Sequence, residues 1–245
     1  IVSDNVTITI TGTEDSPIVS GTYTGSVTED GVGTASGTLN IFDPDISDTP
    51  VFNNVATTAG SNGYGDFVLE NGTWTYILDH STVQALAENE QVNDSITYTA
   101  TNGVSQSITV TINGSNDLPV ISVDTDDGTT ASLTENDASL SATDTLTLTD
   151  IDIIDTVSVD TVSVVVSGVE SELISNNAAL LSMLTFTDGS LANNETTDTF
   201  GWAFDSGSEH FDYLADGEVL TLTYNIRATD SSGGTDDQTI VITIT

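Results

Sequence analysis

The stretch VTITITGTEDSPIV occupies residues 6–19, and ITVTINGSNDLPVI repeats it at residues 108–121. A third copy, IVITIT, fills residues 240–245. In each copy, β-branched apolar residues alternate with polar ones or with each other, as expected for half-buried strands. The first two copies then pass through glycine and an acidic or amide pair to a proline, where the next strand begins. A strand–linker unit that recurs along the chain indicates a tandem array of modules.

The repeat divides the 245 residues into three parts. We predict that residues 1–16 are the final strand and linker of an upstream module. Residues 17–118 then form module A, and residues 119–245 form module B. The pattern leaves open whether the first strand, residues 1–12, stays unpaired or docks on a module of this chain or of another.

Short alternating segments continue between the repeats, and one of them, Val157–Val166, slips out of phase near Asp160. The segments are separated by Asn-Gly, Asp-Gly and Gly-Gly pairs, which are turn signals. Many short strands with regular turns are typical of a β-sandwich. The sequence therefore predicts an all-β chain of two tandem β-sandwiches with short helical insertions.

Module B is longer than module A. From Trp74 and Trp202 onward the two modules align at an offset of 128 residues, whereas Asp43 and Asp150 differ by 107, which leaves 128 − 107 = 21 extra residues. We place this insertion near residues 168–195. Within it, the apolar spacing of residues 171–184 predicts a short helix with Ser171 as its N-cap. In module A, a shorter helical turn is expected near Ser81.

The charge balance excludes several partners. Thirty-eight acidic residues face a single basic one, Arg227, so the formal net charge is −37. Nucleic acid and anionic membrane surfaces are excluded, because both are bound through basic groups. No apolar run approaches the roughly 18 residues that a membrane span needs, so no membrane insertion is expected. Without cysteine there is neither a disulfide nor a thiolate metal site.

Acidic residues gather where the predicted strands end. Calcium binds roughly 6–8 oxygens from carboxylates, amides, carbonyls and water. Residues i and i+2 of an extended segment project to one side, so Asp-x-Asp brings together two carboxylates that repel unless a cation separates them. A solvated turn would explain any single aspartate, but two sets in the same order favour a metal. The first set is Glu14, Asp15, Glu29, Asp43 and Asp45, and the second is Asn116, Asp117, Glu135, Asp150 and Asp152.

These motifs resemble a known family. The joints GTEDSPIV (residues 12–19) and GSNDLPVI (114–121), together with VTED (27–30), ASGTLNIFDPD (35–45) and GTWTYILD (72–79), look like VCBS-type, cadherin-like modules of giant bacterial RTX-type adhesins. The resemblance covers almost all of residues 6–119 and weakens in module B, where the insertion departs from it. It implies two tandem immunoglobulin-like, cadherin-like β-sandwiches, calcium at the inter-module joints and an extracellular position on the bacterial surface. Glu14 stands where the family usually has asparagine, so the resemblance does not imply equal calcium affinity at the two joints.

Two other functions remain open at this stage. Paired carboxylates and the segment containing His80 could suggest an enzyme, but adjacent side chains cannot form a nucleophilic triad and no phosphate loop or zinc spacing is present. A ligand-binding adhesin domain would most naturally use the insertion of module B. The aromatic pairs, Trp74 with Tyr76 and Trp202 with Phe204, suit a sandwich core better than a sugar site. Asp124, Asp126 and Asp127 form either further metal ligands or a solvated turn.

The sequence thus predicts a mechanical function without catalysis. We expect a monomeric segment that extends an adhesin from the cell surface, supports adhesion and biofilm formation, and has neighbouring repeats of the same chain as its partners. Calcium would hold the joints rigid, and without it the clustered carboxylates would repel and the joints would flex.

Overall fold

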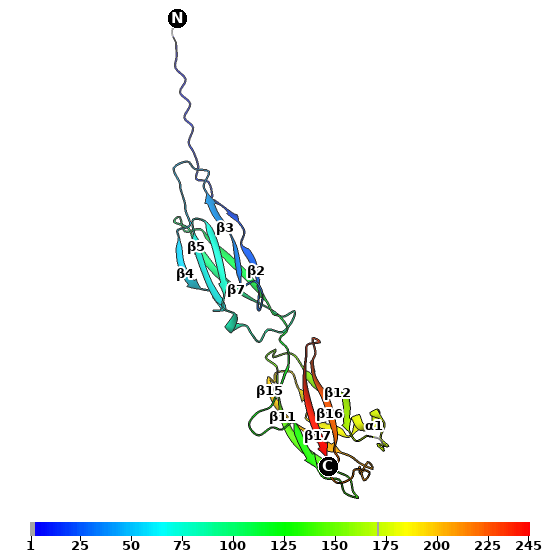
Figure 1. Ribbon diagram of the computed structural model, residues 1–245. Coiled ribbons are helices and arrows are strands. Elements are labelled where there is room, and N and C mark those ends of the chain that lie inside the picture. Colours follow the sequence, from blue (N-terminus) through cyan, green and yellow to red (C-terminus); the bar gives the residue numbers. More distant parts are fainter. Residues whose placement is uncertain (1–2, 171) are drawn as a thin grey trace. The chain divides into compact units, whose positions relative to one another are not determined.

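The structure, a computed structural model, describes residues 3–170 and 172–245 and divides into two compact units (Figure 1). Both units are built almost entirely of strands, which confirms the predicted all-β class. Unit 1 comprises the chain up to Val83 together with Gln91–Asn113, and unit 2 comprises Gln84–Glu90 and Gly114–Thr245.

Unit 1 contains two sheets and an aromatic core. One sheet has the order β1-β3-β6-β5-β4 and the other β2-β8-β7. Trp74 and Tyr76 on β6 are buried, and Trp74 Nε1 donates a hydrogen bond of 2.6 Å to Thr22 O. The elements are β1 Ile18–Gly21, β2 Thr24–Thr28, β3 Thr34–Phe42, β4 Val55–Ala59, β5 Gly65–Glu70, β6 Thr73–Leu78, the 3-10 turn η1 His80–Thr82, β7 Gln91–Thr99 and β8 Ser105–Asn113.

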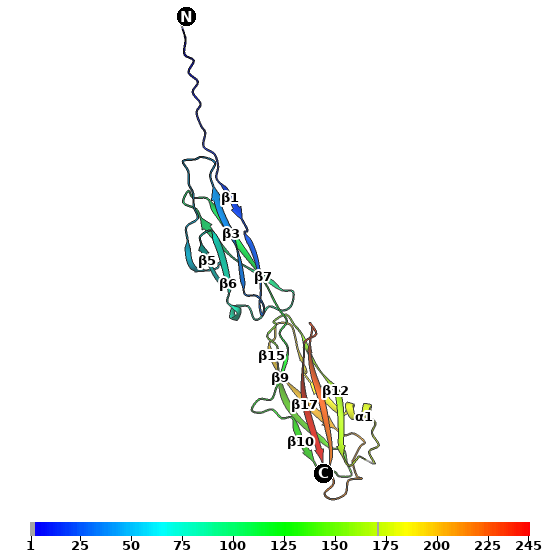
Figure 2. The same ribbon diagram turned by 45° about the horizontal axis from the view of Figure 1, so that its top comes forward.

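Unit 2 also contains two sheets, and its strands β12, β16 and β17 are longer than any in unit 1 (Figure 2). One sheet has the order β10-β17-β16-β12-β14 and the other β13-β15-β11-β9. Trp202 and Phe204 on β15 are buried, and Trp202 Nε1 donates to Gly128 O at 2.8 Å, as Trp74 does to Thr22. The elements are β9 Val120–Ser122, β10 Thr130–Leu133, β11 Ser141–Thr149, β12 Val157–Gly168, α1 Asn177–Ser182, β13 Leu184–Thr187, β14 Ser190–Leu191, β15 Thr197–Asp205, β16 Leu220–Asp230 and β17 Thr235–Ile244.

The core predictions for the aromatic residues are therefore confirmed. The phase slip in β12 is a β-bulge, because the pairing with β16 shifts register between Thr161 and Ser163. An extra residue in one strand changes which side chains face the core after it. The helical turn expected near Ser81 is η1, with Asp79 as its N-cap.

The predicted helix over residues 171–184 is wrong in its start. The helix α1 covers only Asn177–Ser182, and its N-cap is Asn176, whose side chain accepts from Ala179 N at 3.0 Å. The predicted cap, Ser171, lies outside the described residues. Ile174, expected on the buried face, is exposed. Asparagine satisfies free helical N–H groups as well as serine does, so the later cap determines where the helix begins.

The first alternating segment is not a strand here. Residues 3–17 form neither helix nor strand, although β8 and β17, which carry the same pattern, are fully paired (Figure 1). In the described chain, residues 3–17 form no strand pairing with either unit.

Candidate metal centre

A loop that follows β11 brings three carboxylates into the interior of unit 2. Residues 150–155, hereafter acidic loop 2, have the sequence DIDIID, and Asp150, Asp152 and Asp155 are all buried. Asp152 N donates to Asp150 Oδ1 at 3.0 Å, and Asp155 N donates to Asp152 O at 3.0 Å. The loop is therefore a tight turn whose own backbone holds the aspartates in place.

Two further groups close around acidic loop 2. Asp117 N in the linker donates to Asp152 Oδ2 at 2.8 Å, and the neighbouring Asn116 Nδ2 donates to Asp230 Oδ2 at 3.1 Å. Asp230 is buried at the end of β16, where its Oδ1 accepts from the backbone of Ser232 and Gly234. The linker is thereby tied to the loop and to the β16–β17 hairpin within the same unit.

Several oxygens at this place are buried without a hydrogen bond. Within the described part of the chain, these atoms include Oδ1 of Asn116, Oδ2 of Asp150, Oδ1 of Asp152 and Oδ2 of Asp155. Buried polar atoms are almost always hydrogen-bonded, because leaving one unpaired costs about 1–3 kcal/mol. Four such atoms in two short neighbouring segments indicate that a group other than a protein donor satisfies them.

The electrostatics of the loop are unfavourable without a cation. Burial raises the pKa of Asp152 to about 6, and repulsion from Asp117, Asp150 and Asp155 adds to this, against a hydrogen bond from Asp117 N that lowers it. Burial likewise raises the pKa of Asp150, and Asp230, Asp155 and Asp117 contribute repulsion. The one basic residue, Arg227, is engaged elsewhere, in a bidentate pair with Asp237 at 2.6 and 2.7 Å.

Unit 1 contains the same loop in a more exposed form. Residues 43–48, hereafter acidic loop 1, read DPDISD. Asp45 N donates to Asp43 Oδ1 at 3.0 Å, Asp48 N to Asp45 O at 2.8 Å, and Asp15 N to Asp45 Oδ2 at 2.8 Å. These three bonds match those of acidic loop 2 one for one, so the two loops share a single backbone geometry.

Carboxylate oxygens converge in acidic loop 1 as well. One oxygen each from Glu14, Asp45 and Asp48 lie within 4.8 Å of one another. The pKa of Glu14 is raised by repulsion from Asp48, Asp45 and Asp43 and by some burial, and a side-chain hydrogen bond with Asp48 also raises it. Only Asp43 of this group is buried.

Four of the five carboxylates around each acidic loop lie at aligned positions, and the two loops differ in where the fifth lies. At the aligned positions, Asn116 and Asp230 of unit 2 correspond to Glu14 and Asn102 of unit 1. Each loop is thus associated with five carboxylates, but unit 1 carries one of them on the linker instead of on the last hairpin. The linker aspartates Asp117 of unit 2 and Asp15 of unit 1 also occupy aligned positions.

The structure does not bring all members of either predicted ligand set close together. Glu29 N donates to Asn113 O at the end of β8, beside the start of β3, whereas Asp43 follows the end of β3. Nine residues of strand separate those ends by about 27 Å, at about 3.3 Å per residue. Glu135 N likewise bonds Thr245 O beyond β17, at the opposite end of that strand from Asp230. The structure therefore separates Glu29 from acidic loop 1 and Glu135 from acidic loop 2.

The remaining predicted residues do come together around the two loops, and three members of the clusters were missed. Asp48, Asp155 and Asp230 were not among the predicted ligands, yet each belongs to a cluster. A signal for the first two existed, because Asp48 and Asp155 share the 107-residue offset that relates Asp43 to Asp150 and Asp45 to Asp152. Asp230 lies far from the loop in sequence, and only the sheet places it there.

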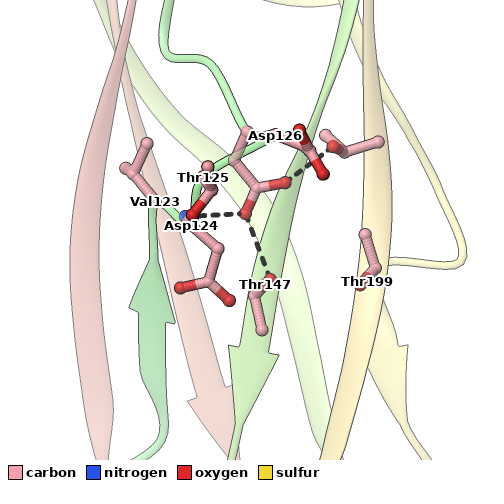
Figure 3. A pocket seen from close by; sticks show the side chains of 8 residues that line it. Val123, Asp124, Thr125, Asp126, Thr147 and Thr199 are labelled. Atoms are coloured by element: carbon pink, nitrogen blue, oxygen red, sulfur yellow. Dashed lines mark hydrogen bonds between the residues drawn. The ribbon is translucent and has the colours of Figure 1, made fainter.

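The predicted cluster of Asp124, Asp126 and Asp127 lies in a separate open depression beside β11 and β15 (Figure 3). Asp127 accepts hydrogen bonds from Thr145 Oγ1 at 2.7 Å, Thr147 Oγ1 at 3.1 Å and Asp124 N at 3.0 Å. These bonds lower the pKa of Asp127 despite some burial. Its carboxylate is satisfied by protein donors, so the geometry favours the turn over additional metal ligands.

The insertion is anchored to unit 2 by a buried acid. Glu209 Oε2 accepts from Ser175 N at 3.1 Å and from Ser175 Oγ at 2.9 Å. Tyr224 Oη, in the core, donates to Leu180 O in α1 at 3.0 Å. Glu209 and Tyr224 thus hold the insertion to the rest of unit 2.

The donor set of acidic loop 2 fits calcium by its chemistry. Carboxylates and an amide oxygen are hard ligands, which Ca²⁺ prefers, and the loop offers several that lack protein donors. Asn116, Asp150, Asp152 and Asp155 would contribute the oxygens named above, and Asp117 and Asp230 carry neighbouring carboxylates. Acidic loop 1 would use Asp43, Asp45, Asp48, Asp15 and Glu14 in the same way.

Comparison with known proteins agrees with the fold. Residues 14–114 match the family of bacterial cadherin-like domains. No curated protein matches the sequence. In the described part of the chain, no helix is long and apolar enough to cross a membrane.

Solved structures that resemble the chain have low sequence identity. PcdhgB3 EC1-4 is 13% identical with a TM-score of 0.44, covering 94% of this chain and 49% of that one. The protocadherin GammaB4 extracellular domain is 15% identical with a TM-score of 0.42, covering 94% and 32%. The Yersinia pseudotuberculosis adhesin InvE is 13% identical with a TM-score of 0.32, covering 92% and 58%. The chain thus spans about half the length, or less, of the first two.

Proposed function

We propose that this chain is a calcium-stiffened extender segment of a secreted bacterial surface adhesin. The observation that carries the proposal is the set of buried, unpartnered oxygens around acidic loop 2. The match of residues 14–114 to bacterial cadherin-like domains supports an adhesion-related role. The proposed role is mechanical, and it requires no substrate and no catalytic residue.

The proposed mechanism follows from the hydrogen bonds of the linker. Asn116 and Asp117 already contact Asp230 and Asp152, so a cation bound by acidic loop 2 fixes the linker to the unit that follows it. Without the cation, Asp117 and Asp152 repel each other, and the linker gains freedom. Acidic loop 1 acts in the same way on the linker before unit 1, through Asp15.

The energetic effect is large for a single domain. Extracellular calcium modules bind at about 10⁻⁴–10⁻³ M. At about 100 times the dissociation constant, one bound ion stabilises the folded state by roughly 2.7 kcal/mol. The free energy of unfolding of a typical domain is about 5–15 kcal/mol, so one bound ion would supply on the order of a quarter of it.

Small-angle scattering across a calcium titration from EDTA tests this function. We expect the scattering to become that of a stiffer particle near millimolar calcium, and Asp152→Asn to shift this change to higher calcium concentration. Asp126→Asn is the matched control, because it removes one carboxylate from an exposed turn outside both loops. Scattering that is the same in EDTA and in calcium would overturn the proposal.

A further inference from the structure

A groove in unit 2 lies between the insertion and the loop that follows β15, and the proposed extender function makes no use of it. It consists of two depressions of about 440 and 290 Å³ that adjoin at Ser208, which lines both. Met183, the C-cap of α1, lines the larger, and Glu209 and Tyr213 line the smaller. Ligand sites typically occupy roughly 300–1,000 Å³. The larger depression alone is of that size, and the two together are hereafter the insertion groove.

Hydrogen bonds already hold the two walls of the insertion groove together. Ser175 in the insertion donates to Glu209 Oε2 through its backbone N at 3.1 Å and its Oγ at 2.9 Å. Glu209 N in turn donates to Ser206 O at 3.0 Å, and Ser206 Oγ accepts from Leu140 N at 2.9 Å. A ligand that enters a preformed groove loses less free energy to ordering the protein.

The loop that follows β15 contains a strained residue where unit 1 has none. Phe211 is buried and has a φ of 60°, a left-handed conformation that bulky side chains rarely adopt. The aligned residue of unit 1, Val83, has a φ of −130°. Strain of this kind persists only where the surrounding structure imposes it, and it is concentrated at functional sites. In unit 2 it lies between His210 and Asp212, which both line the insertion groove.

The polar side chains of this loop are not needed to close it. In both units a glutamate caps the turn before the next strand, since Glu90 Oε2 accepts from Ala87 N at 3.2 Å and Glu218 Oε2 accepts from Ala215 N at 3.0 Å. Three groove residues nevertheless differ between the units: unit 1 has Thr82, Gln84 and Ala85 at the positions of His210, Asp212 and Tyr213. Unit 1 folds without these three side chains, so the fold alone does not account for them.

The rim of the smaller depression combines hydrogen-bond acceptors with an apolar side chain. Glu172 and Asp212 are exposed carboxylates, which only accept hydrogen bonds. Ile174 on the same rim is 80% exposed. The one basic residue, Arg227, is paired with Asp237 and does not line the groove. The groove therefore repels anions and favours a ligand that donates hydrogen bonds and has an apolar face.

Tyr213 favours a hydroxyl ligand over a cation. Its Oη is buried and has no hydrogen-bond partner in the described part of the chain. Burial raises the pKa of Tyr213, with repulsion from Glu209 and Glu170 adding to it, so the phenol keeps its proton at neutral pH. A protonated phenol needs an acceptor, whereas the carboxylates need donors. A hydroxyl group is both, and a cation is only matched to the carboxylates.

We propose that the insertion groove binds a neutral sugar. Asp212 and Glu172 accept hydrogen bonds from its hydroxyl groups, and Ile174 packs against the C–H face of the ring. This inference goes beyond the extender function, because unit 2 would then attach the chain to a glycan in addition to extending it.

Amide chemical shifts of the 245-residue chain in EDTA test this site. The probes are four neutral methyl glycosides, those of glucose, galactose, mannose and N-acetylglucosamine. We expect at least one of them, at millimolar concentration, to shift the amides of residues 172–175 and 205–213 and to leave those of η1 in unit 1 unchanged. Asp212→Gln, which introduces the aligned residue of unit 1, should weaken this binding by about tenfold or more, because a charged acceptor is lost. Asp216→Asn is the matched control, since Asp216 is exposed and lines neither depression, and it should bind as the unchanged chain does.

Three results would overturn the proposal. One is that none of the four glycosides shifts the amides of the groove. Another is that Asp212→Gln and Asp216→Asn bind the sugar equally well, which would place binding elsewhere. The third is that calcium or zinc, added without EDTA, shifts the amides of residues 205–213 while the glycosides do not, which would make the groove a cation site. None of these results concerns the acidic loops, so a failure here leaves the proposed extender function standing.

Discussion

Replacing Asp152 by asparagine should change stability in opposite directions with and without calcium. Asp152 is fully buried, its Oδ1 has no hydrogen-bond partner, and its Oδ2 accepts from Asp117 N. Asparagine keeps an oxygen for Asp117 N and replaces the other oxygen by an amide that can donate to a neighbouring carboxylate. The substitution removes a negative charge from a place where several meet.

The magnitude in calcium-free solution follows from the pKa of Asp152. Raising that pKa from 3.8 to about 6 corresponds to about 3 kcal/mol of destabilisation at neutral pH, since a tenfold change is 1.36 kcal/mol. Relaxation and water entry reduce such penalties, so we expect Asp152→Asn to stabilise unit 2 by about 1–2 kcal/mol in EDTA. In millimolar calcium the variant loses a ligand, and much of the roughly 2.7 kcal/mol that the ion supplies is lost.

Differential scanning calorimetry of Asp152→Asn, in EDTA and in calcium, measures both effects. For a domain of this size, about 1 kcal/mol moves the melting temperature by roughly 3–6 °C. We therefore expect the unit 2 transition to rise in EDTA and to fall in calcium, relative to the unchanged protein. Asp126→Asn should change neither. A fall of similar size in both solutions would show that Asp152 stabilises the fold through its own hydrogen bonds, and would refute the reasoning.

The other predictions concern pH, the first site and the core. In EDTA, unit 2 should become more stable as the pH falls from 7 toward 4, because the folded-state pKa of Asp152 lies above its unfolded value. The contribution of Asp152 protonation to the free energy of unfolding is complete below about 3.8 and is lost as the pH rises through about 6. Urea titrations at several pH values would detect this change. Glu14→Asn should weaken calcium binding at acidic loop 1 by roughly tenfold and leave acidic loop 2 unchanged, and a two-site calorimetric titration that showed equal weakening of both would contradict this. Trp74→Ala should destabilise unit 1 by about 3–5 kcal/mol in urea unfolding followed by hydrogen exchange, with the β16 and β17 amides of unit 2 unaffected.

The strand pattern could be predicted from sequence because period-2 alternation is a local signal. Even the irregularity in β12 left a trace, since the slip seen near Asp160 is the bulge between Thr161 and Ser163. The helix start could not be placed by the same reasoning. Apolar spacing extends over Leu173 and Ile174, but Ser175 is held by Glu209, and the helix begins only after the Asn176 cap. The Asn176 cap determines that boundary, and the residue before it is bonded to Glu209, 34 residues away in the sequence.

The acidic clusters show which part of the candidate metal centre could be predicted from residues that are close in the sequence. Asp43 with Asp45, and Asp150 with Asp152, could be grouped from spacing because both members lie in one turn. Glu29 was grouped with them because it also follows a strand, but successive strand ends lie at alternate ends of a sandwich, so the end of β2 lies a strand length from the end of β3. Asp230 was missed for the opposite reason, because only the course of β16 brings it to the linker.

The two loops also differ in how strongly a cation should affect stability. Both are associated with five carboxylates, but in unit 2 the fifth is the buried Asp230, held by Ser232, Gly234 and Asn116. In unit 1 it is Glu14, on an exposed linker. Charges near water are screened, and their repulsion is weaker than that of buried charges. Removing calcium should therefore destabilise unit 2 more than unit 1, and in a titration acidic loop 2 should account for most of the rise in melting temperature. An equal rise in the two units would mean that the number of carboxylates, and not their burial, determines the effect.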